Sequence, residues 1–111
     1  MLYKILSAAL WARAEPEGRM PWAPVDVADG FVHLSAPDQV RETAAKHFAG
    51  QRDLVLLSVD PERLTPDTLR WEPSRGGAPF PHVYGDVPLV AVARVDPLPF
   101  EDGAFVFPAP L

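Results

Sequence analysis

Apolar residues gather in short runs that predict strands. Residues 54–59, LVLLSV, are apolar at nearly every position, which is the pattern of a strand buried on both faces in the middle of a sheet. Residues 2–6, LYKIL, and residues 89–95, LVAVARV, predict two further strands, and residues 68–72, TLRWE, a shorter one. Asp102-Gly103 is a hairpin signal between two short apolar segments near the end of the chain.

Helical signals of any length fall in the first half of the chain. Ser7 predicts the cap of a short helix that runs to Arg13. Ser35, with a proline and an acid shortly after it, predicts the entry of a second helix that ends near Phe48. Residues 21–30 read as an irregular loop, and Asp60-Pro61 starts a single helical turn.

The order of these elements indicates the fold class. Strands outnumber helices, and they do not alternate with helices as they do in a doubly wound parallel sheet. We therefore predict an α+β fold with a largely antiparallel sheet and short helices in the first half. A length of 111 residues is typical of one domain, spanning residues 1–111.

Charge and composition exclude several classes of function. The net charge is −5, whereas a protein that grips a nucleic-acid backbone needs a basic face. The chain has no cysteine, which removes thiol nucleophiles and thiolate metal sites and fits a reducing cytoplasm. The apolar run at the N-terminus is short and interrupted by Lys4 and Arg13, so we expect neither a signal peptide nor a membrane span.

Polar and aromatic side chains share one face in each of three strand-like segments, because side chains alternate along a strand. The first segment is residues 30–35, GFVHLS, in which Val32 and Leu34 take the opposite, apolar face. The residues on the polar faces are His33 and Ser35 in the first segment, Arg70 and Glu72 in the second, and His82 and Tyr84 in the third, FPHVYG. If these rows converge, they form a cleft with aromatic walls and a few directional polar groups, which is typical of a small-molecule site.

Several of these residues also have an interpretation without function. His33 fits a site residue and a hydrogen-bonded structural histidine equally well, whereas the loop-like setting of His82 favours a site. Arg70 and Glu72 are better explained by an exposed ion pair. The three histidines of the chain are too widely spaced for a metal motif, so no metal is predicted.

Other chemistry finds weaker support in the sequence. The loop at residues 73–79, PSRGGAP, offers Arg75 and backbone N–H groups to a phosphate, but it lacks the strand–glycine–helix context of a phosphate loop. Ser35 lies on the same strand as His33, which is poor geometry for a serine nucleophile and its base. Two histidines together with Lys4 or Arg70 are able to cleave a phosphodiester by acid–base catalysis if they lie close together.

Longer motifs resemble those of one family. GFVHLSAPDQV, DLVLLSVDPERL, LRWEP, PFPHVYG and AVARV stand in the same order as in a family of small bacterial proteins known as domain of unknown function 952. The resemblance extends from Leu2 to about Pro97. No activity is established for that family, so the resemblance implies a fold for this chain and does not imply a particular reaction.

That family is grouped distantly with the ADP-ribosyltransferase-like fold, which binds NAD in a cleft between two small antiparallel sheets. The resemblance implies that the first strand lines the cleft with Lys4, where family members usually carry a histidine. It also implies that the second strand brings His33 and Ser35 to the cleft. For this chain the resemblance implies two small, mainly antiparallel sheets around a cleft, with NAD as the expected ligand.

The late motif departs from the pattern of ADP-ribosyltransferases, which often carry a catalytic glutamate there. This chain has His82 and Tyr84 at that place, and Glu72 is the nearest acid upstream. The resemblance makes Glu72 the candidate to stabilise the positive charge that develops on a sugar ring during transfer.

Two hypotheses follow from these residues. The first is a nucleotide- or NAD-related transferase or hydrolase, with no certain cofactor and with NAD as the candidate substrate. In it Lys4 and Arg70 hold phosphate and Tyr84 stacks on the ligand, while His33 or His82 bonds ribose or moves a proton. The second is a non-catalytic module that binds a small ligand or a partner. The two histidines in polar rows favour the first, and the missing histidine and glutamate favour the second.

Overall fold

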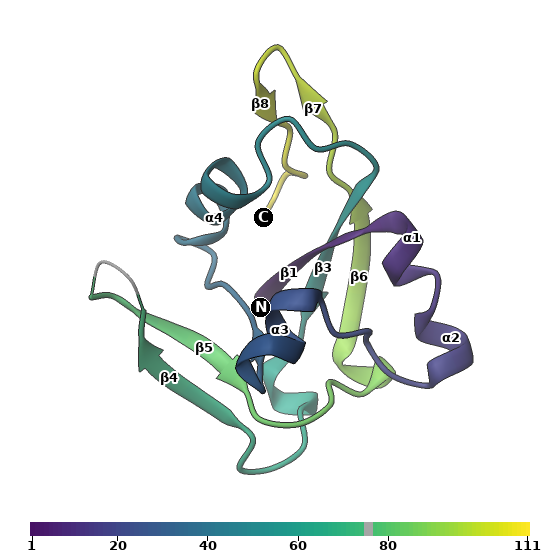
Figure 1. Cartoon of the computed structure of the whole chain (residues 1–111), viewed down its shortest axis with the longest axis vertical. Coiled ribbons are helices and arrows are strands. Elements are labelled where there is room, and N and C mark those ends of the chain that lie inside the picture. Colours follow the sequence, from purple (N-terminus) through teal and green to yellow (C-terminus); the bar gives the residue numbers. More distant parts are fainter. Residues whose placement is uncertain (75–76) are drawn as a thin grey trace.

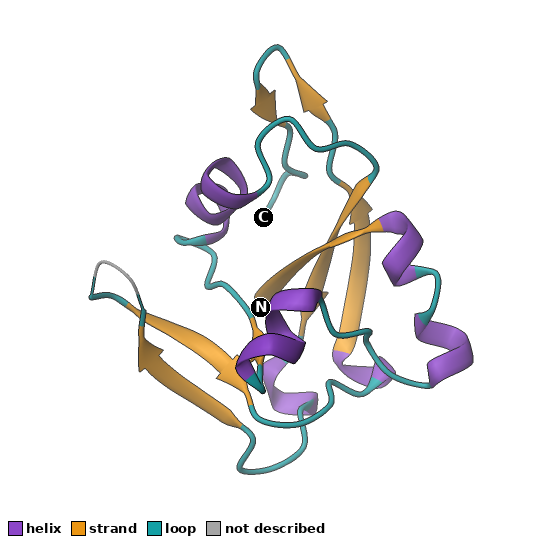
Figure 2. Cartoon of the chain, in the orientation of Figure 1, coloured by secondary structure: helices purple, strands orange, loops and turns teal. Residues whose placement is uncertain are grey.

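The computed structural model describes residues 1–74 and 77–111 and shows an α+β fold with antiparallel sheets, as predicted (Figures 1 and 2). The first sheet has the order β1-β3-β6, with β1 at Leu2–Ser7, β3 at Leu54–Val59 and β6 at Val92–Pro97. Its central strand is the LVLLSV segment, which confirms the position expected from its apolar pattern. The residues Arg75 and Gly76 of the candidate phosphate loop lie outside the described residues.

The second sheet carries the polar rows found in the sequence. Its order is β2-β5-β4, with β2 at Val32–His33, β5 at Pro79–Val83 and β4 at Leu69–Pro73. Among the described residues, the two sheets are joined by one isolated bridge, between Tyr3 and Ser35. The outer edge of β1 is therefore paired at one point and open farther along the strand.

The predicted hairpin at Asp102-Gly103 is confirmed, with β7 at Phe100–Glu101 and β8 at Ala104–Phe105. The Ser7 cap is also confirmed, because its hydroxyl accepts the Leu10 N–H at 3.0 Å, but the helix ends at Trp11 and not at Arg13. The helices are α1 at Ala8–Trp11, α2 at Ala14–Glu17, α3 at Pro24–Asp29 and α4 at Val40–His47, with single 3₁₀ turns η1 at Pro61–Arg63 and η2 at Leu89–Ala91. None of the helices in residues 1–74 and 77–111 is long and apolar enough to cross a membrane.

Three predictions of local structure are wrong. Residues 21–30 hold the helix α3, because Pro24 fits its first position and the Asp26 carboxylate accepts the Ala23 N–H at 2.8 Å. The helix α4 begins at Val40 and not at Ser35, whose backbone is extended by its bridge to Tyr3. The predicted strand at residues 89–95 begins only at Val92, because the turn η2 occupies Leu89–Ala91.

The apolar core lies on both faces of the first sheet. On one face, Leu6 and Leu57 pack with Val32 and Val83 of the second sheet. On the other face, Ile5 and Leu56 pack with residues of α4. Lys4 projects from β1 on the same side as Leu6, so its side chain enters the space between the two sheets.

Candidate functional site

The three polar rows meet on one face of the second sheet. In the antiparallel register His82 of β5 stands opposite His33 of β2 on one side and opposite Arg70 of β4 on the other, and Glu72 stands opposite Phe80. Residues directly opposite each other share a face. The rings of His33 and His82 have their centroids 5.4 Å apart, so the geometry that the alternating pattern predicted is present.

Glu72 holds one side of His82. One carboxylate oxygen, Oε1, lies 2.8 Å from His82 Nδ1 and accepts the Tyr84 hydroxyl at 2.7 Å. Hydrogen bonds from His82 and then from Tyr84 hold the pKa of Glu72 below its ordinary value, and the same bond to Glu72 raises the pKa of Tyr84. The guanidinium of Arg70 lies over the Tyr84 ring at 5.0 Å, in place of the predicted ion pair with Glu72.

A buried carboxylate links three segments of the chain beside this sheet. Asp26 of α3 is fully buried, and its two oxygens lie 2.8 and 2.9 Å from the ammonium of Lys4. The Lys4 ammonium also donates to the His33 carbonyl at 2.9 Å. The Lys4 ammonium is therefore held by an ion pair and a hydrogen bond with Asp26 and by a second hydrogen bond to the His33 carbonyl.

The imidazole of His33 lies between two carboxylates. Its Nδ1 is 2.7 Å from Asp26, and its Nε2 is 2.9 Å from Asp29. Ionised carboxylates only accept hydrogen bonds, so both contacts are made together when the ring carries both of its protons. The ring of Phe31 packs at 4.5 Å from His33 and at 4.2 Å from His82, and it covers both imidazoles.

The partners of Asp26 predict how stability depends on pH. Burial favours the neutral acid, but hydrogen bonds from His33 and the charge and hydrogen bond of Lys4 outweigh burial and lower the pKa of Asp26. The unfolded chain then binds a proton at a higher pH than the folded chain does. We expect the free energy of unfolding to fall as the pH drops below the ordinary value of 3.8 toward the lower folded pKa. Urea unfolding at a series of pH values measures this slope, and it should be flatter for Asp26→Asn than for the unaltered protein.

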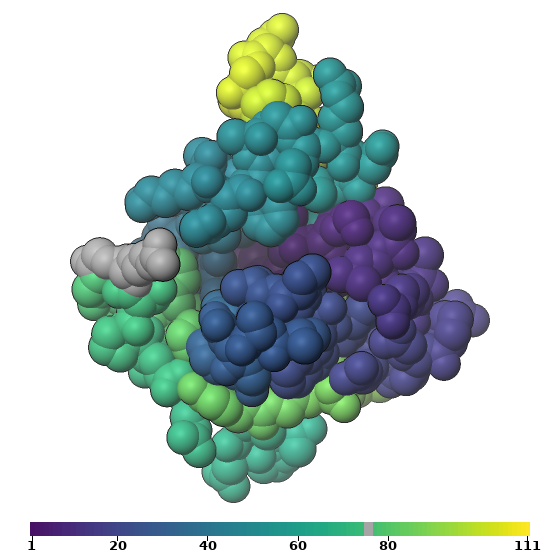
Figure 3. Space-filling view, in the orientation of Figure 1, coloured from purple at the N-terminus to yellow at the C-terminus, as the bar shows by residue number. Residues whose placement is uncertain are grey.

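A cavity of about 700 Å³ opens along the free edge of β1. Figure 3 shows its mouth as a hollow between α4, α3 and β1. Its walls are mainly apolar, with residues such as Leu6 and Phe48. Such a volume, with a few polar groups in apolar walls, is in the range of small-molecule sites.

The predicted site residues divide between this cavity and the neighbouring face of the second sheet. Those that line the cavity are Lys4, His33, Ser35 and His82. Those that do not line it are Arg70, Glu72 and Tyr84. His82 therefore belongs to both groups, because Glu72 contacts its Nδ1 while the residue forms part of the cavity wall.

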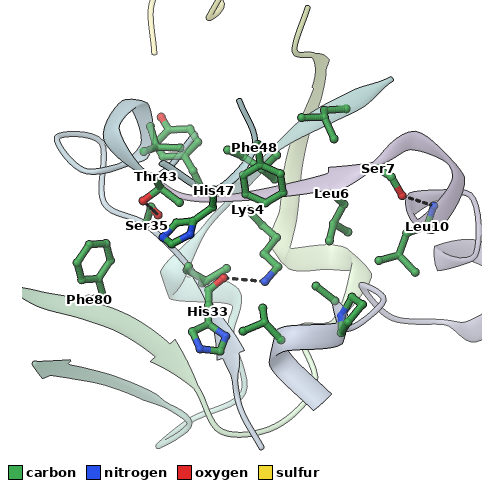
Figure 4. Close-up of a pocket in the computed structure, with 18 of the residues that line it drawn as sticks. Lys4, Leu6, Ser7, Leu10, His33, Ser35, Thr43, His47, Phe48 and Phe80 are labelled. Carbon is green, nitrogen blue, oxygen red and sulfur yellow. Dashed lines mark hydrogen bonds between the residues drawn. The ribbon is translucent and has the colours of Figure 1, made fainter. Parts of the chain in front are cut away.

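Sequence reasoning missed several residues of this region. Asp26 was assigned to a loop. The sequence does carry a signal for the helix, because Pro24 favours the first position of a helix and Asp26 then stands in the first turn, where acids are common. His47 was considered only as one of three widely spaced histidines, and it lines the cavity together with Thr43, Ser35 and Phe48 (Figure 4). Its position on α4 gave no signal, since the packing of α4 beside β1 is a tertiary feature.

Comparisons with known proteins give a family and close structural relatives. The X-ray crystal structure of protein CC0527 from Caulobacter crescentus is 50% identical in sequence, with a TM-score of 0.87 over 95% of this chain and 92% of that chain. The solution NMR structure of CC0527 is 47% identical, with a TM-score of 0.79 over 94% of this chain and 89% of that chain. No curated protein matches the chain. Residues 5–95 match the model of the family described as protein of unknown function (DUF952), and the chain therefore belongs to the DUF952 family.

Proposed function

We propose that this protein is a nucleotide- or NAD-related transferase or hydrolase, with the cavity as its binding site and His82 as its proton-transfer group. The observation that carries this proposal is a cavity-lining histidine whose Nδ1 is held by a carboxylate outside the cavity. With Nδ1 fixed in this way, Nε2 is the ring nitrogen left for a ligand, to which it would act as a base or an acid. Glu72 does not touch the cavity, so its role is to position His82 and not to stabilise charge on the sugar.

The open edge of β1 supports a ligand with an amide group. The backbone N–H and C=O of Tyr3 bond to Ser35 at 2.8 and 2.9 Å, so they point to the outer edge of β1. Backbone groups two residues apart in an antiparallel strand face the same edge, so those of Ile5 face the cavity that Ile5 lines. The carboxamide of NAD carries an adjacent donor and acceptor, which match this pair.

Lys4 has a different role here from the phosphate contact expected of it. Its ammonium is paired with Asp26 and donates to the His33 carbonyl, and burial lowers its pKa while Asp26 partly offsets that effect. A phosphate would have to break this buried ion pair. Lys4 therefore holds β1, α3 and β2 in register around the cavity.

Amide NMR titration of the labelled protein with NAD, ADP-ribose and AMP at millimolar concentration tests the proposal. NAD should shift the amide signals of Ile5, Ser35 and His82. Ile5→Pro removes the outward N–H but leaves the β1–β3 bonds intact, because that N–H is not part of the ladder. We expect it to bind NAD about tenfold more weakly than Ile5→Ala, the matched variant that keeps the N–H. A flat response to all three nucleotides refutes the proposal.

A second candidate function is a binding module without catalysis on the same cavity. The mutual bonding of Lys4, Asp26 and His33 favours it, because these polar groups are already satisfied within the protein. The two functions differ in one measurement: a binding module takes up NAD and releases it unchanged, whereas an enzyme releases nicotinamide.

A further inference from the structure

The cavity has a polar wall on the side of α4 that the proton-transfer site does not use. The hydroxyls of Ser35 and Thr43 lie 3.2 Å apart, and Ser35 is 5% exposed. The ring of His47 lies close to this pair, and all three residues line the cavity (Figure 4). Among the residues that the structure describes, neither ring nitrogen of His47 has a hydrogen-bond partner within the chain.

Resting on the function proposed above, we infer that Ser35, Thr43 and His47 form a subsite for the vicinal hydroxyls of a pentose. Hydroxyl side chains donate and accept, and so do the two hydroxyls of a ribose. A diol can insert next to the Ser35–Thr43 pair and bond to both side chains, while His47 takes a further bond.

Electrostatics at this wall favour hydroxyls over phosphate. His47 is the last residue of α4 and Thr43 lies one turn before it, so the unpaired backbone carbonyls at the end of the helix give this wall a partial negative charge near His47. The cations of α4 are engaged elsewhere, because Lys46 pairs with Glu42 at 2.7 Å and Arg41 lies over the Phe107 ring at 5.1 Å. Lys4 is neutralised by Asp26. An anion would meet a negative helix end here, whereas a diol would meet neutral donors and acceptors.

The subsite also lies where the pentose of NAD would be if the carboxamide is bound at Ile5. Ser35 is bridged to Tyr3, two residues from the Ile5 backbone pair that would hold the carboxamide. In NAD the pentose is joined directly to the ring that carries the carboxamide. A ligand bound by Ile5 therefore brings its first pentose to the neighbourhood of Ser35 and Thr43.

The test compares NAD with nicotinamide, which has the carboxamide and lacks the pentose. Thr43→Val removes the hydroxyl and keeps the shape of the side chain. We expect this variant to bind NAD about five- to tenfold more weakly and to bind nicotinamide as tightly as the unaltered protein does. Thr65→Val, which removes an exposed hydroxyl outside the cavity, is the matched control and should change neither affinity.

Each outcome of this test decides one question. If NAD binds and Thr43→Val weakens NAD and nicotinamide equally, or weakens neither, the pentose subsite is wrong and the proposed function stands. If inorganic phosphate shifts the amide signals of Thr43 and His47, the subsite holds an anion and the inference is overturned. If NAD does not bind the unaltered protein at all, the proposed function fails, and the inference fails with it.

Discussion

Asp26→Asn is expected to lower the free energy of unfolding by about 3–5 kcal/mol, the largest stability effect of any single substitution proposed for this protein. The substitution nearly preserves volume and keeps one oxygen for the Ala23 N–H, but it removes the negative charge. The ammonium of Lys4, 5% exposed, then remains buried without a counter-charge. Urea unfolding at neutral pH measures the change.

Asp29→Asn is the matched control for that experiment. Asp29 contacts the same imidazole, at Nε2 of His33, but its side chain is 47% exposed. Because exposed ion pairs contribute little, we expect a loss of less than about 1 kcal/mol. Lys4→Met combined with Asp26→Asn should cost less than the sum of the two single variants, since the pair is removed together. A loss below about 1 kcal/mol for Asp26→Asn contradicts a structural role for the ion pair.

The convergence of the polar rows was predictable because it depends on a local rule. Side chains alternate along a strand, so the sequence around His33 and around His82 already separates a polar face from an apolar one. Antiparallel pairing then places the two polar faces on the same side of the sheet, with His82 between His33 and Arg70. The central position of β3 was predictable for a similar reason, since its residues are apolar on both faces.

The buried network around Asp26 was not predictable from local patterns. Its members come from three separate segments, and only the folded chain brings Lys4 and His33 to the same carboxylate. From the family resemblance, Lys4 was expected to line the cleft and to hold a phosphate. In the structure the side chain of Lys4 is buried between the sheets, where a lysine needs an acid as its partner. The acid was hidden in a segment interpreted as a loop.

The cavity itself follows from the way the two sheets separate. The bridge between Tyr3 and Ser35 joins them at one point, and the edge of β1 beyond it is left open. Asp26 of α3 accepts hydrogen bonds from Lys4 of the first sheet and from the His33 N–H of the second, so it connects α3 to both sheets beside the cavity. The Lys4–Asp26 ion pair therefore holds the strands and the helix around the cavity in place, whereas Glu72 contacts one cavity-lining side chain, that of His82.

The largest effect on reactivity is expected at His82. For the hydrolysis of NAD, the bond between the nicotinamide nitrogen and the ribose carbon breaks, and nicotinamide leaves with the electron pair. In the proposed reaction the oxygen of water bonds to that carbon, and His82 takes the proton of the water. We expect His82→Asn to slow the release of nicotinamide by about 100-fold or more, because general base catalysis contributes on that order. Chromatographic measurement of nicotinamide release gives the rate.

Glu72→Gln separates the positioning of His82 from the presence of its ring. The variant keeps the ring and one acceptor oxygen for Nδ1 but removes the negative charge, so the imidazole loses its charged partner. We expect a smaller loss of rate than for His82→Asn, with nearly unchanged binding of NAD, since Glu72 does not line the cavity. Glu62→Gln, at an exposed glutamate outside the cavity, should leave the rate unchanged. If His82→Asn binds NAD normally and the unaltered protein releases no nicotinamide, the cavity is a binding site without hydrolysis, and the carboxylate–histidine pair is structural.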